Sequence, residues 1–146
     1  MMEFLWKCAS SDLKHKNVNG CDALQIACKL GDNSAVFLLL HWGADPNTID
    51  NDGNTALLWL VKNYNSRKGP ATIDLIKLLL KFGADASYQS PNDGNTALHI
   101  IALEKEVDLS LAFQIFQHSR TGAGTIENMG NLTPYNVRVY FPYSDY

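Results

Sequence analysis

The chain has 146 residues, of which 46% are hydrophobic and 18% charged, and its formal net charge is −3. These values are typical of a folded globular protein, and the length is sufficient for a sizeable hydrophobic core. The 12 lysine and arginine residues form no extended basic run, which argues against a nucleic-acid-binding surface, because phosphate recognition needs concentrated positive charge. No apolar stretch approaches the roughly 20 residues that span a bilayer, so we expect no contact with a membrane.

Three cysteines, Cys8, Cys21 and Cys28, and the absence of a signal peptide indicate a reducing compartment. We therefore expect a cytoplasmic location, which includes the cytoplasm of a host cell. These cysteines and His15 could form a metal-binding set in principle. Structural zinc sites, however, normally use short Cys-x-x-Cys pairs, which this chain lacks. We expect no metal and no other cofactor.

The sequence contains an internal repeat. The residue before each Ala-Leu or Pro-Tyr pair is Asp22, Thr55, Thr96 or Thr133, at intervals of 33, 41 and 37 residues. A Gly-Ala-Asp motif also occurs twice, at Gly43 and Gly83. A base period near 33 residues with insertions explains these intervals. Such periods are the sequence signature of repeat architectures.

The first helix of the first unit is predicted at 23–29. Asp22 precedes it as an N-cap, and Gln25 stands three residues later, which gives a capping box. Gly31 can end this helix. A second, leucine-rich helix is predicted at 35–41, with Gly43 as a left-handed cap.

The segment from Ala44 to Asn54 is rich in turn-forming residues and predicts a projecting β-hairpin closed by Asn-Asp-Gly. The next unit repeats the pattern. Thr55 caps a helix at 56–62, and a second helix follows at 73–81. Between these two helices lies a polar inserted loop at 64–71.

The third unit is predicted to begin at Thr96, with His99 three residues later and a first helix continuing through Leu103. Its second helix is predicted at 109–117, before a glycine-rich stretch. The Gly-Ala-Asp motif is absent after this helix.

Together these features resemble the ankyrin repeat. The resemblance implies an all-α fold: a solenoid of stacked helix-turn-helix units with projecting β-hairpin loops. The family usually has a histidine where Gln25 and Leu58 stand, so we expect the first two units to lack the usual threonine–histidine hydrogen bond that Thr96 and His99 keep. The residues that carry the resemblance are Gly20, Ala23-Leu24-Gln25, Gly43-Ala44-Asp45, Gly53-Asn54-Thr55-Ala56-Leu57, Gly83-Ala84-Asp85 and Gly94-Asn95-Thr96-Ala97-Leu98-His99.

The chain is expected to divide into three repeats flanked by partial units. The aromatic-rich ends indicate either that the chain was cut from a longer array or that these aromatics fold back as a cap. The predicted divisions are a partial repeat at 1–18, repeats at 19–51, 52–92 and 93–129, and a partial repeat or cap at 130–146.

No residue pattern predicts an enzyme. Asp45 and Asp85 recur as corner residues of the repeat, and His99 fits a role within its own helix start, so each is interpreted as structural. The glycines at 122–124 lack the lysine and the preceding strand of a phosphate loop. We therefore expect neither catalysis nor a small-molecule substrate.

The resemblance implies that the hairpins and first helices form a concave face that binds another protein. Trp59 has two interpretations, as a packing residue or as an exposed aromatic anchor. The alternative function is a substrate-targeting module of a larger enzyme, or of a viral or bacterial effector directed at host cells. The predicted partner-binding residues are the positions free of core duty: Lys29, Leu30, Ile49, Asn51, Asn54, Lys62, Asn63, Tyr88, Gln89, Asn92, Asn95, Leu103 and Glu104.

Overall fold

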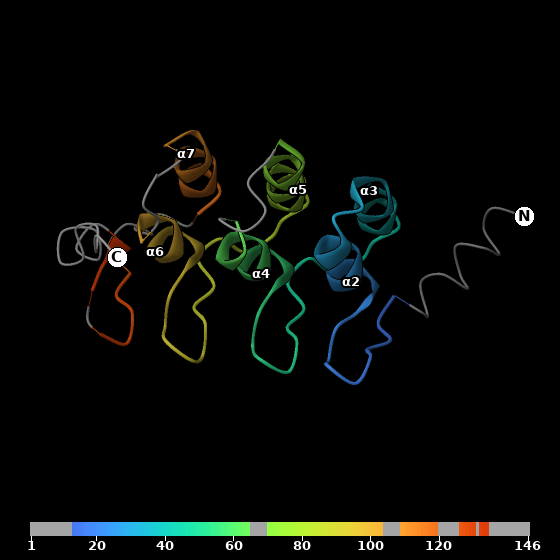
Figure 1. Cartoon of the computed structure of the whole chain (residues 1–146), viewed down its shortest axis with the longest axis horizontal. Helices are drawn as coiled ribbons and strands as arrows, with labels where there is room; N and C mark the ends of the chain where they lie inside the picture. Colours follow the sequence, from blue (N-terminus) through green and yellow to red (C-terminus); the bar gives the residue numbers. More distant parts are fainter. Residues whose placement is uncertain (1–12, 65–69, 104–108, 120–125, 131, 135–146) are drawn as a thin grey trace, which may run out of the picture.

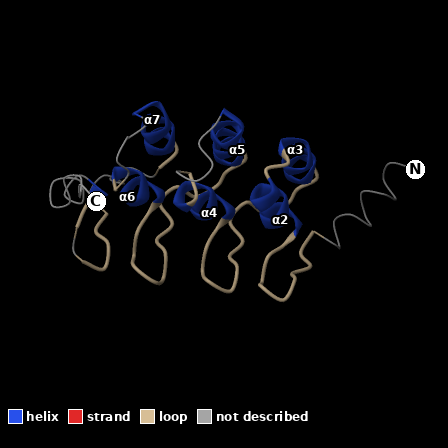
Figure 2. Ribbon diagram, in the orientation of Figure 1, coloured by secondary structure: helices blue, strands red, loops and turns tan. Residues whose placement is uncertain are grey.

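The computed structural model describes residues 13–64, 70–103, 109–119, 126–130 and 132–134. Within these residues, six helices form two rows (Figures 1 and 2). The first helices of the units, α2, α4 and α6, lie side by side in the inner row, and the second helices, α3, α5 and α7, form the outer row. The helices are α2 (Ala23–Leu30), α3 (Asn33–His41), α4 (Ala56–Lys62), α5 (Pro70–Lys81), α6 (Ala97–Ala102) and α7 (Leu109–Gln117).

The inner helices begin at the predicted cap residues. The Asp22 carboxylate accepts a hydrogen bond from the Gln25 amide at 2.9 Å, and the Gln25 side chain accepts one from the Asp22 amide at 3.2 Å. Thr55 Oγ1 accepts from the Leu58 amide at 3.2 Å. These bonds satisfy first-turn amides that have no partner within the helix. The predicted capping box of the first unit is therefore confirmed.

Two helices begin earlier than the sequence pattern predicts. α3 begins at Asn33, because the Asp32 side chain caps it by accepting from the Ala35 amide at 3.0 Å. α5 begins at Pro70, since proline fixes a helical φ and needs no amide partner in the first turn. Pro70 and Ala71 therefore belong to a helix and not to the inserted loop predicted at 64–71.

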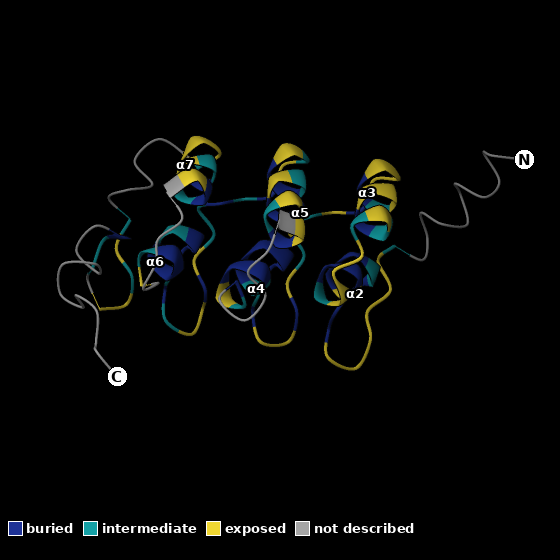
Figure 3. Ribbon diagram, turned by 45° about the horizontal axis from the view of Figure 1, so that its top comes forward, coloured by how far each residue is buried: buried dark blue, intermediate teal, exposed yellow. Residues whose placement is uncertain are grey.

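The core lies between the two rows of helices, where Figure 3 shows the buried residues concentrated. The middle unit contributes most, since α4 and α5 each have a neighbouring helix on both sides. Leu57, Leu75, Leu79 and Leu80 are all at most 3% exposed. Their predicted place in the core is confirmed.

A loop projects from the inner row before each of α2, α4 and α6, and Figure 1 shows these loops side by side. Asp50 N–H donates to the carbonyl of Asn54 at 3.0 Å, and Ser90 N–H donates to that of Asn95 at 3.0 Å. Gly53 and Gly94 turn the chain there with φ of 76° and 70°, which side chains with a Cβ rarely adopt. The loops have the projecting hairpin shape that the resemblance implied, but the described residues in them form turns and no β-strand.

Candidate protein-binding surface

The exposed side of the inner helices carries one position that repeats in all three units. Lys29, Lys62 and Leu103 each stand seven residues after the cap residue of their unit, so the stacking of α2, α4 and α6 brings them into one row. We call this surface, together with the adjoining loops, the inner surface.

Lys29 is fixed by three neighbours. Its ammonium donates to Cys21 Sγ at 3.1 Å, lies 3.6 Å from the Asp50 carboxylate and stands 5.6 Å from the centre of the Trp59 ring. Burial alone would lower the pKa of Lys29, but the contacts with Cys21 and Asp50 outweigh this effect and raise it. Lys29 therefore stays charged, and the nearby Asp50 largely compensates its charge.

Trp59 packs partly against the hydrophobic core and carries the Lys29 ammonium over its ring. Its side chain is half-buried, which favours the packing interpretation over that of an isolated aromatic anchor.

Lys62 is exposed, and its ammonium donates to the side-chain oxygen of Asn54 at 2.8 Å. Because Asn54 is neutral, this bond leaves the lysine charge uncompensated. Asn63 is half-buried, and its side chain donates to the carbonyl of Trp59 at 2.8 Å, which fixes it at the end of α4.

Several apolar side chains on the inner helices and in the loops are exposed. Leu30 is 76% exposed, Leu103 49%, Ile49 43% and Ile26 38%. Ile26 is absent from the set predicted from sequence. Its place four residues before Leu30, on the same side of one helix, is the signal that would have found it.

The loop asparagines connect neighbouring units. The Asn51 side chain donates to the carbonyl of Val18 at 2.9 Å, and that of Asn92 donates to the carbonyl of Asp52 at 3.1 Å. Asn95 accepts from the side chain of Asn128 at 2.9 Å. These amides therefore hold successive loops in register, in addition to any contact they offer a partner.

Two further predicted residues have similar structural bonds. The Tyr88 hydroxyl donates to the carbonyl of Gly53 at 2.9 Å, and the Gln89 side chain donates to that of Glu127 at 2.8 Å. Glu104, the last predicted binding residue, lies outside the described residues.

Gln25 joins the first unit to the loop of the next unit. Besides closing the capping box, its side-chain amide donates to the carbonyls of Thr48 at 3.0 Å and Asn54 at 3.2 Å, in the loop of the next unit. The first unit lacks the usual threonine–histidine pair, as expected, because Asp22 and Gln25 stand in its place. Gln25 instead supplies its own polar bonds to the next loop. The second unit also lacks the pair, as expected, because the apolar and buried Leu58 stands at the histidine position.

His99 has the same arrangement in the third unit. Its Nδ1 accepts from the Thr96 amide at 3.2 Å, so Nε2 carries the proton and donates to the carbonyl of Leu132 at 2.8 Å. The side chain is fully buried, and burial lowers its pKa below the ordinary 6.5. Its structural interpretation, and not a catalytic one, fits this environment.

Comparison with known sequences assigns the repeat. The sequence profile described as "Ankyrin repeat" matches residues 19–51, and that described as "Ankyrin repeats (many copies)" matches residues 71–107. The chain belongs to the ankyrin-repeat family.

Its relatives include larger proteins. A tyrosine-protein kinase of Hydra vulgaris is 32% identical over 131 residues, which cover 86% of this chain and 16% of the kinase. An ankyrin repeat protein of Acanthamoeba polyphaga mimivirus is 36% identical over 78 residues, which cover 53% of this chain and 12% of the viral protein. The chain thus spans less than a fifth of the length of either relative.

The ankyrin repeat domain of Bcl-3, a member of the IkappaB protein family, matches the structure with a TM-score of 0.72 and 28% identity. The match covers 86% of this chain and 50% of that domain chain. Ankyrin repeats are in general modules of protein–protein interaction, and their fold is typically non-catalytic.

The described residues of this ankyrin array show no sign of a metal centre. They contain no group of three His, Cys, Asp or Glu side chains that could hold a metal ion. Cys28 is buried. Its burial and, to a lesser degree, the negative charge of the nearby Asp22 raise the pKa of its thiol to about 12, so the thiol stays protonated. None of the helices in the described ranges is both long and apolar enough to cross a membrane.

Proposed function

We propose that this ankyrin array binds a partner protein through its inner surface, without catalysing a reaction. The observation that carries the proposal is the row of Lys29, Lys62 and Leu103, which lies beside the exposed Leu30 and Ile26. Apolar side chains exposed next to a lysine suit a protein surface that presents both apolar and acidic groups.

The residues of this surface have different roles in the proposal. Leu103 and Leu30 provide apolar contacts, and Lys62 provides the charge that pairs with a carboxylate of the partner. Lys29 already pairs with Asp50 and serves to hold Trp59 in place. The loop amides keep the surface rigid, so little conformational entropy is lost when the partner binds.

The proposed surface keeps the thirteen positions predicted from sequence and adds Ile26. The positions on helices are the stronger ones, because the loop asparagines already have structural bonds. We retain the proposed repeat boundaries at 19–51, 52–92 and 93–129 and the proposed cytoplasmic location.

The test is a matched capture experiment. Tagged wild-type protein and the double variant Lys62→Ala, Leu103→Ala are incubated with one cell lysate, and the bound proteins are compared by quantitative mass spectrometry. A third bait, Asp74→Ala with Lys77→Ala, changes exposed residues of the outer helix α5. A specific partner should be depleted on the inner-surface variant and retained on the outer-row variant. Equal capture by all three baits would contradict the assignment of the inner surface.

A second candidate function is that of a targeting module of a larger enzyme or of a viral or bacterial host-directed effector. It is favoured by the kinase and mimivirus relatives, since this chain matches only a small part of each. Sequencing the complete transcript from which the chain derives would test it. A catalytic domain in the same reading frame would support the enzyme alternative, and a stop codon directly after Tyr146 with no upstream coding sequence would reject it.

A further inference from the structure

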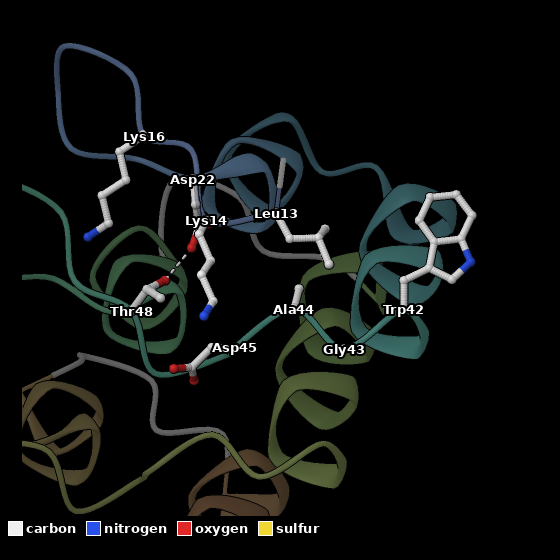
Figure 4. A pocket seen from close by; sticks show the side chains of 9 residues that line it. All are labelled: Leu13, Lys14, Lys16, Asp22, Trp42, Gly43, Ala44, Asp45 and Thr48. Carbon is white, nitrogen blue, oxygen red and sulfur yellow. Dashed lines mark hydrogen bonds between the residues drawn. The ribbon is translucent and has the colours of Figure 1, made fainter. Parts of the chain in front are cut away.

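A groove of about 690 Å³ opens at the end of the stack nearest α2 and α3 (Figure 4), and none of Lys29, Lys62 and Leu103 lines it. Its lining includes Leu13 and Lys14 on one side and Gly43, Ala44 and Asp45 on the other. Figure 4 shows the Lys14 side chain extending toward Asp45 and the Leu13 side chain toward Ala44. We call the turn after each outer helix a corner. Corners lie at 43–47, after α3, and at 83–87, after α5, and residues 13 and 14 belong to the corner one unit earlier, where they correspond to residues 46 and 47. The groove separates the first of these three corners from the second.

The next pair of corners is closed by one side chain. The carboxamide of Asn47 donates to the carbonyl of Gly83 at 3.1 Å and accepts from the amide of Asp85 at 2.7 Å. A carboxamide is suited to this bridge because it has both a donor and an acceptor.

Lys14 occupies the place that corresponds to Asn47 one unit earlier, 33 residues before it. Other contacts between these units show the same displacement of 33 residues: Lys16 bonds to the carbonyl of Ile49, and Asn51 to that of Val18. Lysine has donors only, so it cannot form both bonds of the bridge. This substitution explains why the first pair of corners is open where the second is closed.

The groove therefore presents the two backbone groups that a carboxamide would bridge. By the repeat, the Gly43 carbonyl corresponds to that of Gly83, and the Asp45 amide to that of Asp85. Among the described residues, neither group has a hydrogen-bond partner. Lys14 also forms no ion pair there, as the one ion pair in the described ranges joins Lys29 and Asp50.

We propose that this groove is a second protein-binding site, which accepts an asparagine or glutamine side chain of a partner protein. The partner's carboxamide would donate to the Gly43 carbonyl and accept from the Asp45 amide, as Asn47 does at the next junction. Leu13 and Ala44 would contact the apolar part of the same segment. A carboxylate would be attracted by Lys14 and Lys16, which also line the groove, but it cannot donate to the Gly43 carbonyl and would face the Asp45 side chain, so we propose the carboxamide as the ligand.

The binding test uses a peptide copied from the chain itself. The acetylated and amidated peptide Ala-Asp-Pro-Asn-Thr-Ile, which is the sequence of residues 44–49, is titrated at millimolar concentrations into the ¹⁵N-labelled full chain. The control peptide has aspartate in place of its asparagine. We expect amide shifts at Gly43, Ala44 and Asp45 with the asparagine peptide and weaker shifts with the aspartate peptide. Equal shifts with both peptides, or larger shifts with the aspartate peptide, would overturn the carboxamide proposal.

Two variants of Lys14 distinguish the effect of closing the groove from the effect of removing the lysine charge. Lys14→Asn should close the groove by restoring the bridge, which abolishes the peptide shifts and raises the melting temperature by about 2–4 °C. Lys14→Ala should keep the groove open and retain the shifts. If Lys14→Asn still responds to the peptide, or Lys14→Ala does not, the proposal is wrong. The proposal also fails if the free protein shows nuclear Overhauser effects between residues 1–12 and Ala44 and no peptide response, since the occupant would then be the chain's own segment.

Discussion

Gln25 and His99 perform the same structural task in different repeats. Each closes the start of its own inner helix, and each donates a hydrogen bond to a backbone carbonyl of the following loop. Leu58 occupies the corresponding position of the middle repeat and is buried among apolar side chains. At this helix position the contact with the next loop is therefore polar in the first and third repeats and apolar in the middle repeat.

Replacing Gln25 by alanine should destabilise the array. The variant leaves the carbonyls of Thr48 and Asn54 and the amide of Asp22 without this partner in a largely buried region, which costs about 1–3 kcal/mol. Urea unfolding followed by circular dichroism measures the change. Gln117→Ala, an exposed change on α7, is the control and should alter the unfolding free energy by less than about 0.5 kcal/mol.

Stability should depend on pH through His99. Its pKa is lowered in the folded state, chiefly by burial, so the unfolded chain binds the proton more readily. Stability contributed by the neutral side chain is therefore present above pH 6.5 and is lost as the pH falls from about 6.5 toward the lowered folded pKa. Melting temperatures between pH 8 and pH 5 measure this loss of stability. The nearby carboxylate of Asp93 raises the pKa of His99 and so makes the loss smaller.

The variant His99→Gln isolates this titration. Glutamine makes the corresponding bonds in the first repeat and carries no titratable group, so the variant should melt with a smaller decrease between pH 7 and pH 5 than the wild type. An unchanged pH dependence would assign the effect to other groups.

Leu79→Ala should cost about 2–5 kcal/mol, because this fully buried side chain of α5 lies between neighbouring helices and its removal leaves a cavity. Chemical denaturation gives the unfolding free energy. Lys77→Ala, on the exposed side of the same helix, tests for a general effect of substitution in α5. A loss below about 1 kcal/mol at Leu79 would contradict its assignment to the core.

The inserted segment between α4 and α5 should tolerate replacement, but its first residue should not. Exchanging residues 65–69 for an equal number of glycines and serines should preserve the helical circular dichroism, since polar surface loops tolerate changes of sequence. Tyr64→Ala should lower the unfolding free energy by about 3 kcal/mol, because Tyr64 is only 6% exposed. If the loop exchange abolishes the helical signal, residues 65–69 are part of the scaffold.

Local signals in the sequence predict the helices well, because a cap such as Asp22 or Thr55 lies next to the helix that it starts. The bonds between repeats are harder to predict. The reach of Gln25 into the next loop and the bridge from Asn47 to Gly83 depend on how units stack, and their partners are 23 to 36 residues away in sequence. The helix positions of the candidate surface could be proposed from the sequence. The hydrogen bonds of the loop asparagines could not, because they depend on how the units stack. The groove beside Lys14 becomes apparent only when its corner is compared with the next one.

The bonds from Asn51 and Asn92 have a consequence for how such an array can change over evolutionary time. Both side chains attach to a main-chain carbonyl, in one case that of a valine and in the other that of an aspartate. Because every residue has a backbone carbonyl, this hydrogen bond places little constraint on the identity of the residue that accepts it. A unit that carries its own asparagine could therefore be duplicated, or inserted beside an unrelated unit, and still dock in the correct register.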